Sequence, residues 1–487
     1  MKKIVIALFS VLIASSASMA LANGIRPDFS ILPSGTNISL VAQYTNGNKE
    51  RLFAHQSKQL RIPASTQKII TALAALLELG EDFRFETRFL SQDKIHQGKL
   101  NADLILVMSG DPTFTRQHLL KMVTTLKSSG LNRVNGDIII NTSIFSSHDK
   151  AAGWSWNNLA HCYNTAPAAS IIDGNCFYAS ISPASKVGQT ATVSTHSHYP
   201  IQIKSQVITT AGSSHTRYCE LDIVTKDRNN YLLTGCMNIK EAKRYLHFAV
   251  TDSESYIADV LRAQLAQQHI SYTGNVIFSK QPISNKVNTL ALNQSVRLVV
   301  LLTEMLKYSN NLIADTVFRT IGAHYFNMPG TWRNSSDAVR KILKNKTHID
   351  LKNSVIADGS GLSRLNLLSA ETMIQILEYM ASHDKSLKMI KMLPIAGIDG
   401  TLQYRNSVRN LPLKANIIAK TGYLEGSYNL AGFIKTNSNR YIAFVQFLTG
   451  YNEKSETHRM KQDAIMLFEK AFYAKCFGHC NKKSNLK

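Results

Sequence analysis

A hydroxyl and an amine lie three residues apart in Ser65-Thr66-Gln67-Lys68, at the start of a long apolar segment. On a helix this spacing places both groups on one face, so the serine can act as a nucleophile and the lysine as its base. The same pattern also begins at Ser91, Ser147, Ser382 and Ser484. Only Ser65 opens a long apolar helix, which can hold a hydroxyl rigidly beside outward-pointing backbone N–H groups. We therefore select Ser65 and Lys68.

Two further short motifs could complete such a site. Residues 309–311 read Ser-Asn-Asn and lie between two helical segments, where an ordinary helix cap is the alternative interpretation. Residues 420–422 read Lys-Thr-Gly on an apolar strand. Each motif alone is weakly diagnostic, and Ser-Trp-Asn at 155–157 resembles the first of these two by chance. In this order, however, the three motifs are the signature of serine β-lactamases and penicillin-binding proteins.

The chain resembles the low-molecular-mass, class C penicillin-binding D-alanyl-D-alanine carboxypeptidases, of the penicillin-binding protein 4 type, over most of its mature length. Four further segments carry the resemblance: Gly-Asp-Pro-Thr at 110–113, Ile-Asp-Gly-Asn-Cys-Phe at 172–177, Asp-Gly-Ser-Gly-Leu-Ser-Arg at 358–364, and Ala-Gly-Ile-Asp-Gly-Thr at 396–401. It implies a serine hydrolase that cuts peptidoglycan stem peptides as a carboxypeptidase and a D,D-endopeptidase. It also implies covalent inhibition by β-lactams and no cofactor or metal.

The resemblance implies a role for each motif residue. Ser65 attacks the carbonyl of the penultimate D-alanine, and Lys68 takes its proton. Lys68 must be neutral for this step, which needs desolvation and a neighbouring cation such as Lys420 to lower its pKa. Ser309 relays a proton to the leaving D-alanine, and Asn311 holds the substrate amide.

The Lys-Thr-Gly strand has the remaining roles. Lys420 and Thr421 bind the terminal carboxylate, while Gly422 lets the substrate backbone lie along the strand edge. Backbone N–H groups of Ser65 and Tyr423 form the oxyanion hole. Water then hydrolyses the acyl-enzyme.

Two more residues are expected to recognise a substrate side chain. In many bacteria the third residue of the stem peptide is diaminopimelate, whose free end carries an ammonium and a carboxylate. The resemblance places Asp173 and Arg364 beside that end, whereas the alternative interpretation is a turn residue and a surface ion pair. Glu425 stands where we would expect a neutral polar residue. Its carboxylate could strengthen ammonium binding or repel the neighbouring carboxylate.

The order of elements predicts an α/β (α+β) fold. Its catalytic domain resembles those of serine β-lactamases and penicillin-binding transpeptidases, and a large strand-rich insertion splits this domain. Helical periodicity marks residues 66–79, 296–306, 312–324, 370–381 and 460–475, and apolar strands mark 417–421, 428–434 and 441–448. We assign 23–87 and 288–487 to the catalytic domain. Short runs of alternating apolar and polar residues assign 88–287 to inserted accessory domains. The resemblance implies that there are two of these domains and that one is nested in the other.

Residues 1–22 have the pattern of a cleaved signal peptide, so we expect a periplasmic protein. The six cysteines suggest three disulfides, between Cys162 and Cys176, Cys219 and Cys236, and Cys476 and Cys480. Other pairings stay open, as does a metal site at Cys476, His479 and Cys480. The formal net charge of +22 favours peripheral association with anionic envelope polymers. Export excludes nucleic acid as a natural partner.

Two rival functions share this scaffold. A class A β-lactamase deacylates with a Glu-activated water, but this chain has no Glu-Xaa-Xaa-Leu-Asn segment and a far longer gap between Ser65 and Ser309. A non-catalytic peptidoglycan-binding protein would not need Ser65, Lys68 and Lys420 intact. Both alternatives are therefore weaker than the peptidase.

Overall fold

The computed structural model describes residues 25–46, 49–212, 218–283, 286–436, 440–451 and 458–484, with side chains of the last helix described from 462 to 478. The expected signal peptide falls outside this part of the chain, and so does the side chain of Cys480, the expected partner of the buried Cys476. Within it, no helix has both the length and the apolar character needed to cross a membrane.

The catalytic part is built on a five-stranded antiparallel sheet of order β2-β1-β23-β22-β21. Its strands come from both ends of the chain: β1 Asn37–Tyr44, β2 Arg51–His55, β21 Ile417–Leu424, β22 Ser427–Lys435 and β23 Tyr441–Thr449. β1 pairs with β23 in a register that places Val41 opposite Val445. The N-terminal and C-terminal segments therefore form one body, and β21 lies at its edge.

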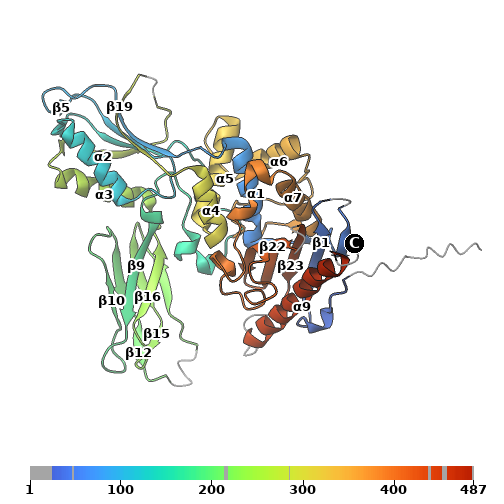
Figure 1. The fold of residues 1–487 in the computed structure, drawn as a ribbon. Coiled ribbons are helices and arrows are strands. Elements are labelled where there is room, and N and C mark those ends of the chain that lie inside the picture. Colours follow the sequence, from blue (N-terminus) through green and yellow to red (C-terminus); the bar gives the residue numbers. More distant parts are fainter. Residues whose placement is uncertain are drawn as a thin grey trace, which may run out of the picture.

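Side chains alternate between two cores on the two faces of this sheet. Val41, Phe433 and Val445 point into a helical core, whereas Leu40 and Phe444 point to the other face. This alternation follows from the two-residue period of a strand. The second face is covered by α9, His458–Ser484, which packs Phe468 and Phe472 against it (Figure 1).

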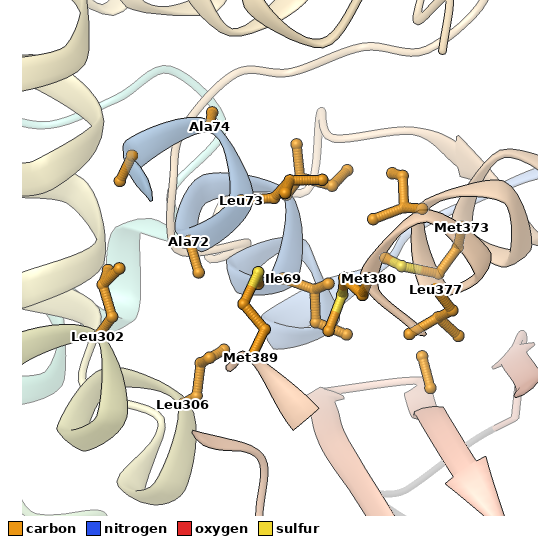
Figure 2. Packing of buried hydrophobic residues seen from close by; sticks show 14 of the residues in the cluster. Ile69, Ala72, Leu73, Ala74, Leu302, Leu306, Met373, Leu377, Met380 and Met389 are labelled. Carbon is orange, nitrogen blue, oxygen red and sulfur yellow. The ribbon is translucent and has the colours of Figure 1, made fainter. Parts of the chain in front are cut away.

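The helical core surrounds α1, Lys68–Leu79, the helix that follows the candidate nucleophile. The helices around it are α4 Leu298–Tyr308, α5 Asn311–Phe326, α6 Trp332–Thr347 and α7 Ala370–Ser382. Figure 2 shows Leu302 and Leu306 of α4 on one side of α1, and Leu377 of α7 on the other. Apolar contacts from several helices therefore fix the axis of α1, and with it the position of Ser65.

Residues between α1 and α4 form two further lobes (Figure 1). The first contains a five-stranded sheet of order β18-β8-β6-β4-β19 packed against two helices. Its elements are β4 Glu86–Ser91, β6 Leu104–Val107, α2 Arg116–Ser128, β8 Ile138–Asn141, α3 Ser253–Gln267, β18 Val276–Ser279 and β19 Asn288–Gln294. A small sheet of β5 Lys99–Leu100, β7 Arg133–Val134 and β17 Ser271–Tyr272 extends it.

The second lobe consists of short strands in three small sheets. They are β9 Cys176–Ser182, β10 Thr192–Thr195, β11 Gln202–Ser205, β12 Ile208–Thr210, β13 Asp222–Thr225, β14 Asn230–Thr234, β15 Cys236–Asn238 and β16 Arg244–Ala249. Disulfides join Cys162 to Cys176 and Cys219 to Cys236, as expected from the sequence. The first links the start of β9 to a loop that reaches the candidate site.

The insertion is strand-rich, as predicted, but it also contains helices α2 and α3, which the sequence pattern did not reveal. The buried residues Leu119, Met122, Val123 and Leu126 recur at helical spacing in α2. The helix does not stand out as an apolar segment because polar and basic residues fill its other positions. α6 was also missed: its helical period is clear, but its mean hydropathy is low and its exposed face is basic.

Candidate active site

Ser65 lies on a short 3-10 turn, Ala64–Gln67, that leads directly into α1. The preceding Ala64 is fully buried and has a φ of 47°, a left-handed conformation that costs about 1–3 kcal/mol for a residue with a Cβ. Gly361 packs against this turn, because a Cβ at Gly361 would lie 2.0 Å from the Ala64 carbonyl oxygen. The geometry of the turn thus depends on the loop of residues 358–364.

The Lys68 ammonium is completely buried and meets three oxygen atoms. Its Nζ lies 3.0 Å from Ser65 Oγ, 2.6 Å from Asn311 Oδ1 and 2.7 Å from the Ser360 carbonyl oxygen. These contacts match the three donors of an ammonium group. The candidate nucleophile, its base and one residue of the second motif are therefore in direct contact.

Burial lowers the pKa of Lys68 to about 8, because desolvation disfavours the ammonium. The carboxylates of Asp315 and Asp358 act in the opposite direction. Asp315 is buried on α5, one turn after Asn311, and accepts the backbone N–H groups of Gly359 and Ser360 at 2.8 Å. It thereby fixes the loop whose Ser360 carbonyl contacts Lys68.

The second lysine pairs with the second serine. Lys420 on β21 is fully buried, and its Nζ lies 2.9 Å from Ser309 Oγ and 2.9 Å from the Thr421 carbonyl oxygen. Ser309 ends α4 in a left-handed conformation with a φ of 61°, which separates α4 from α5. Burial, and then the charge of Lys68, place the pKa of Lys420 well below its usual value.

β21 passes directly over the nucleophile turn. A Cβ at Gly422 would lie 2.7 Å from the Pro63 carbonyl oxygen and 3.1 Å from Thr66 Cγ2, so glycine permits this close approach. Thr421 Oγ1 donates a hydrogen bond to Thr401 Oγ1 at 2.9 Å. Tyr423, the next residue on the strand, is 51% exposed at the rim.

The insertion forms one wall of the site. Asn311 Nδ2 donates to the Tyr163 carbonyl oxygen at 2.9 Å, beside the Cys162–Cys176 disulfide. Trp154 Nε1 donates at 2.9 Å to the buried carboxylate of Asp358. Asn311 is therefore held from two sides, by Lys68 and by the inserted loop.

The two side-chain recognition candidates occupy different environments. Asp173 Oδ2 forms an ion pair with Arg116 Nε in a tight turn. Arg364 Nη1 donates to the Glu425 carbonyl oxygen at 3.0 Å, and its Nη2 lies 3.8 Å from Glu425 Oε2. Arg364 Nε donates to Ser155 at 3.2 Å. Each candidate thus has an ion-pair partner within the protein.

Comparison with known proteins agrees with this arrangement. Residues 31–472 match the model of the D-Ala-D-Ala carboxypeptidase 3 (S13) family. The chain is also 39% identical over 442 residues to the D-alanyl-D-alanine carboxypeptidase DacB of Haemophilus influenzae, covering 91% of each chain. The chain belongs to the S13 family. The resemblance inferred from the motifs is confirmed.

Solved structures extend the similarity of this S13 chain to its fold. The crystal structure of penicillin binding protein 4 from Haemophilus influenzae matches with a TM-score of 0.88 and 38% identity, covering 92% of this chain and 98% of that one. A complex of that protein with a β-lactam matches with a TM-score of 0.84. The predicted fold class, a penicillin-binding catalytic unit with an insertion, is therefore confirmed.

Several residues of this S13 site were not singled out from the sequence. Asp315 and Trp154 shape the surroundings of Lys68. The Ser360 carbonyl accepts from Lys68 itself, and the Tyr163 carbonyl accepts from Asn311. A signal existed for Asp315, which interrupts the apolar face of α5 one turn after Asn311. No pattern in the sequence could identify the carbonyl contacts. Among the described residues, no cluster of His, Cys, Asp or Glu could hold a metal ion.

Proposed function

We propose that this chain is a serine D-alanyl-D-alanine carboxypeptidase and D,D-endopeptidase that hydrolyses peptidoglycan stem peptides through an acyl-enzyme on Ser65. The main support for this proposal is the 3.0 Å contact between Ser65 Oγ and the buried amine of Lys68. A nucleophile needs an adjacent base of lowered pKa, and the pKa of about 8 for Lys68 supplies one. The relatives named carboxypeptidases in Haemophilus and Actinomadura support the same reaction.

The two buried lysines suggest how substrate binding starts the reaction. Asp315 and Asp358 favour the proton on Lys68, whereas no carboxylate contributes to the pKa of Lys420. A substrate carboxylate at Lys420 and Thr421 would raise the pKa of Lys420, because an opposite charge favours the ammonium. The charged Lys420 would then lower the pKa of Lys68, which becomes neutral and accepts the Ser65 proton. A peptide with a correctly placed carboxylate thus activates its own nucleophile.

Bond formation and cleavage follow from these positions. Ser65 Oγ bonds to the carbonyl carbon of the penultimate D-alanine, and the N–H groups of Ser65 and Tyr423 stabilise the oxyanion. Ser309, bonded to Lys420, passes a proton to the leaving amine as the C–N bond breaks. Water then attacks the ester and regenerates Ser65. Asn311 holds the amide of the substrate during acylation.

One carboxylate site serves both activities. In carboxypeptidase action the leaving group is D-alanine, and in endopeptidase action it is the D-centre of a diaminopimelate residue in a cross-link. Each carries a carboxylate on the carbon next to the leaving amine. Lys420 and Thr421 would therefore bind either leaving group in the same way.

We also propose that Asp173 and Arg364 recognise the free end of diaminopimelate. Because Asp173 already pairs with Arg116, the substrate ammonium would share that carboxylate. Glu425 adds a carboxylate beside Arg364 and weakens its attraction for the substrate carboxylate. The test compares a peptide with a full diaminopimelate side chain and one truncated to alanine, using Asp173→Ala. We expect a loss of about ten- to a hundred-fold on the full peptide only. Equal losses on both peptides would mean that Asp173 supports the fold.

The location and domain roles belong to the same proposal. The signal-like start, the two disulfides and the net charge of +22 support a protein that acts in the periplasm and associates peripherally with anionic envelope polymers. Residues 23–87 and 288–487 act as the catalytic domain, and 88–287 as accessory domains. The contacts of Trp154 and Tyr163 suggest that the insertion limits access to one side of the site.

The decisive experiment uses penicillin, a covalent mimic of D-alanyl-D-alanine. After incubation, peptide mass spectrometry should detect the adduct on the Ser65 peptide. Ser65→Ala should abolish it, whereas Ser382→Ala, at an exposed copy of the same motif, should not. Digestion of purified muropeptides then separates loss of D-alanine from cleavage of cross-linked dimers. No adduct and no product would favour a non-catalytic binding protein, and rapid penicillin turnover would favour a β-lactamase.

A further inference from the structure

A cavity of about 670 Å³ lies between the first inserted lobe and the helices of the catalytic part, lined on one side by the C-terminal half of α5. Its volume lies within the range of small-molecule sites. It shares no lining residue with the candidate active site. The cavity is therefore a separate feature of the fold.

The inserted sheet supplies the other wall, at the ends of three parallel strands. β6 runs parallel to β8, and β8 runs parallel to β18. Ser109, Ile144 and Lys280, which follow these strands, all line the cavity. The cavity thus lies beyond the carboxyl ends of these three parallel strands.

One face of the sheet carries polar groups into the cavity. Arg88 of β4 pairs with Val107 of β6, and Ser109 follows two residues later on the same face. The opposite face, with Phe89 and Leu106, packs into the core with α2 and α3. Arg88 and Ser109 therefore project away from the core because strand side chains alternate.

Two of these polar residues carry a buried atom without a partner. Arg88 Nε and Ser109 Oγ are inaccessible to solvent, and neither has a hydrogen-bond partner among the described residues. A buried unsatisfied donor is costly, and its presence beside a cavity calls for a bound group that would accept from it after a small side-chain movement. Arg88 and Ser109 are both lining residues of the cavity.

The charged residues that line the cavity indicate that the bound group is an anion. Arg84, Arg88 and Lys280 contribute three cations, whereas Glu86 is the only Asp or Glu among the lining residues. Glu86 accepts a hydrogen bond from Gln294, and Lys280 has no ion-pair partner in the described chain. The rest of the lining is largely apolar, with Phe83, Ile144 and Met328 among it.

We propose that this cavity binds an amphiphilic oxyanion, a carboxylate or phosphate head on an apolar body. The head is held by the Arg88 guanidinium and the Ser109 hydroxyl, with Lys280 nearby. A guanidinium fork matches both head groups. The apolar body lies between Ile144 of the insertion and Met328 after α5. The ligand thereby bridges the insertion and the catalytic part.

The test is isothermal titration calorimetry of the full protein with decanoate, decyl phosphate and decyltrimethylammonium. We expect one or both anions to bind and the cation not to bind, and the tighter anion identifies the head group. Arg88→Gln and Lys280→Gln should each weaken anion binding, by about tenfold for Arg88. Arg133→Gln, an exposed arginine elsewhere on the lobe, should leave binding unchanged.

Three results would overturn the proposal: no binding by either anion, equal binding by the cation, or unchanged affinity in both cavity variants. Circular dichroism of each variant checks that it is folded. If Arg88→Gln does not fold, Lys280→Gln carries the test, because the Lys280 side chain has no hydrogen bond or ion pair in the described part of the chain. The outcome is independent of the proposed catalytic function, which is measured at Ser65 in the same samples.

Discussion

Replacing Asn311 by aspartate should move the pH dependence of acylation without removing the nucleophile. Asn311 Oδ1 lies 2.6 Å from Lys68 Nζ, so Asn311→Asp places an anion in direct contact with the base. An opposite charge at this range raises the pKa of a lysine by about 1 to 3 units. The pKa of Lys68 would rise from about 8 to about 9 or above.

The sign and size of the effect follow directly. Acylation requires neutral Lys68, so the rate below pH 8 falls about tenfold for each unit by which its pKa rises. At pH 7 we expect a loss of about ten- to a thousand-fold in Asn311→Asp. The ratio of variant to native rates should climb as the pH rises to 9.5, because the native enzyme reaches its plateau first.

Fluorescent-penicillin acylation, followed by stopped flow from pH 6 to 9.5, measures the native midpoint and shows whether the variant's midpoint lies higher. The matched control is Asn310→Asp, since Asn310 caps α5 through Ile313 N and aspartate caps equally well. It adds the same charge one residue away and should leave the midpoint near that of the native enzyme. A lower rate with an unchanged midpoint in Asn311→Asp would refute the assignment of Lys68 as the titrating base.

Three further changes test other parts of the site. Lys68→Arg should abolish acylation because a guanidinium does not deprotonate, whereas Lys420→Arg keeps the charge and should retain part of the acylation rate. Gel-based penicillin labelling measures both variants, and identical labelling would contradict the different roles of the two lysines. Gly422→Ala should slow acylation about ten- to a hundred-fold, because the added Cβ pushes β21 away from the turn that carries Ser65, at a strain of about 1–3 kcal/mol. A native acylation rate in stopped flow would mean that β21 does not pack tightly against this turn. Trp154→Phe removes a donor from the buried Asp358 and should destabilise the fold by about 1.5–3 kcal/mol in urea titrations. Trp332→Phe removes a similar bond to an exposed carbonyl oxygen, so a loss as large as that of Trp154→Phe would argue against the buried carboxylate as the cause.

The long apolar elements were the easiest to predict from the sequence. The helix after Ser65 and the strands of residues 417–448 were located within a few residues, because their apolar periodicity is strong. Helices α2 and α6 were missed, since their buried positions are diluted by basic and polar residues. Both helices have a low mean hydropathy, so they do not stand out as apolar segments although α6 is clearly amphipathic.

The sequence by itself determined the family of this protein and predicted its reacting groups: three motifs in a fixed order contain a serine, two lysines and a second serine. Only the tertiary structure decided how these groups meet. Ser309 and Lys420 are more than a hundred residues apart, and their contact depends on pairing between the two ends of the chain and on the packing of α4. The surroundings of Lys68 likewise depend on Asp315, on the Ser360 carbonyl and on burial. Desolvation and backbone contacts depend on tertiary packing and not on residue type, so they cannot be read from the sequence alone.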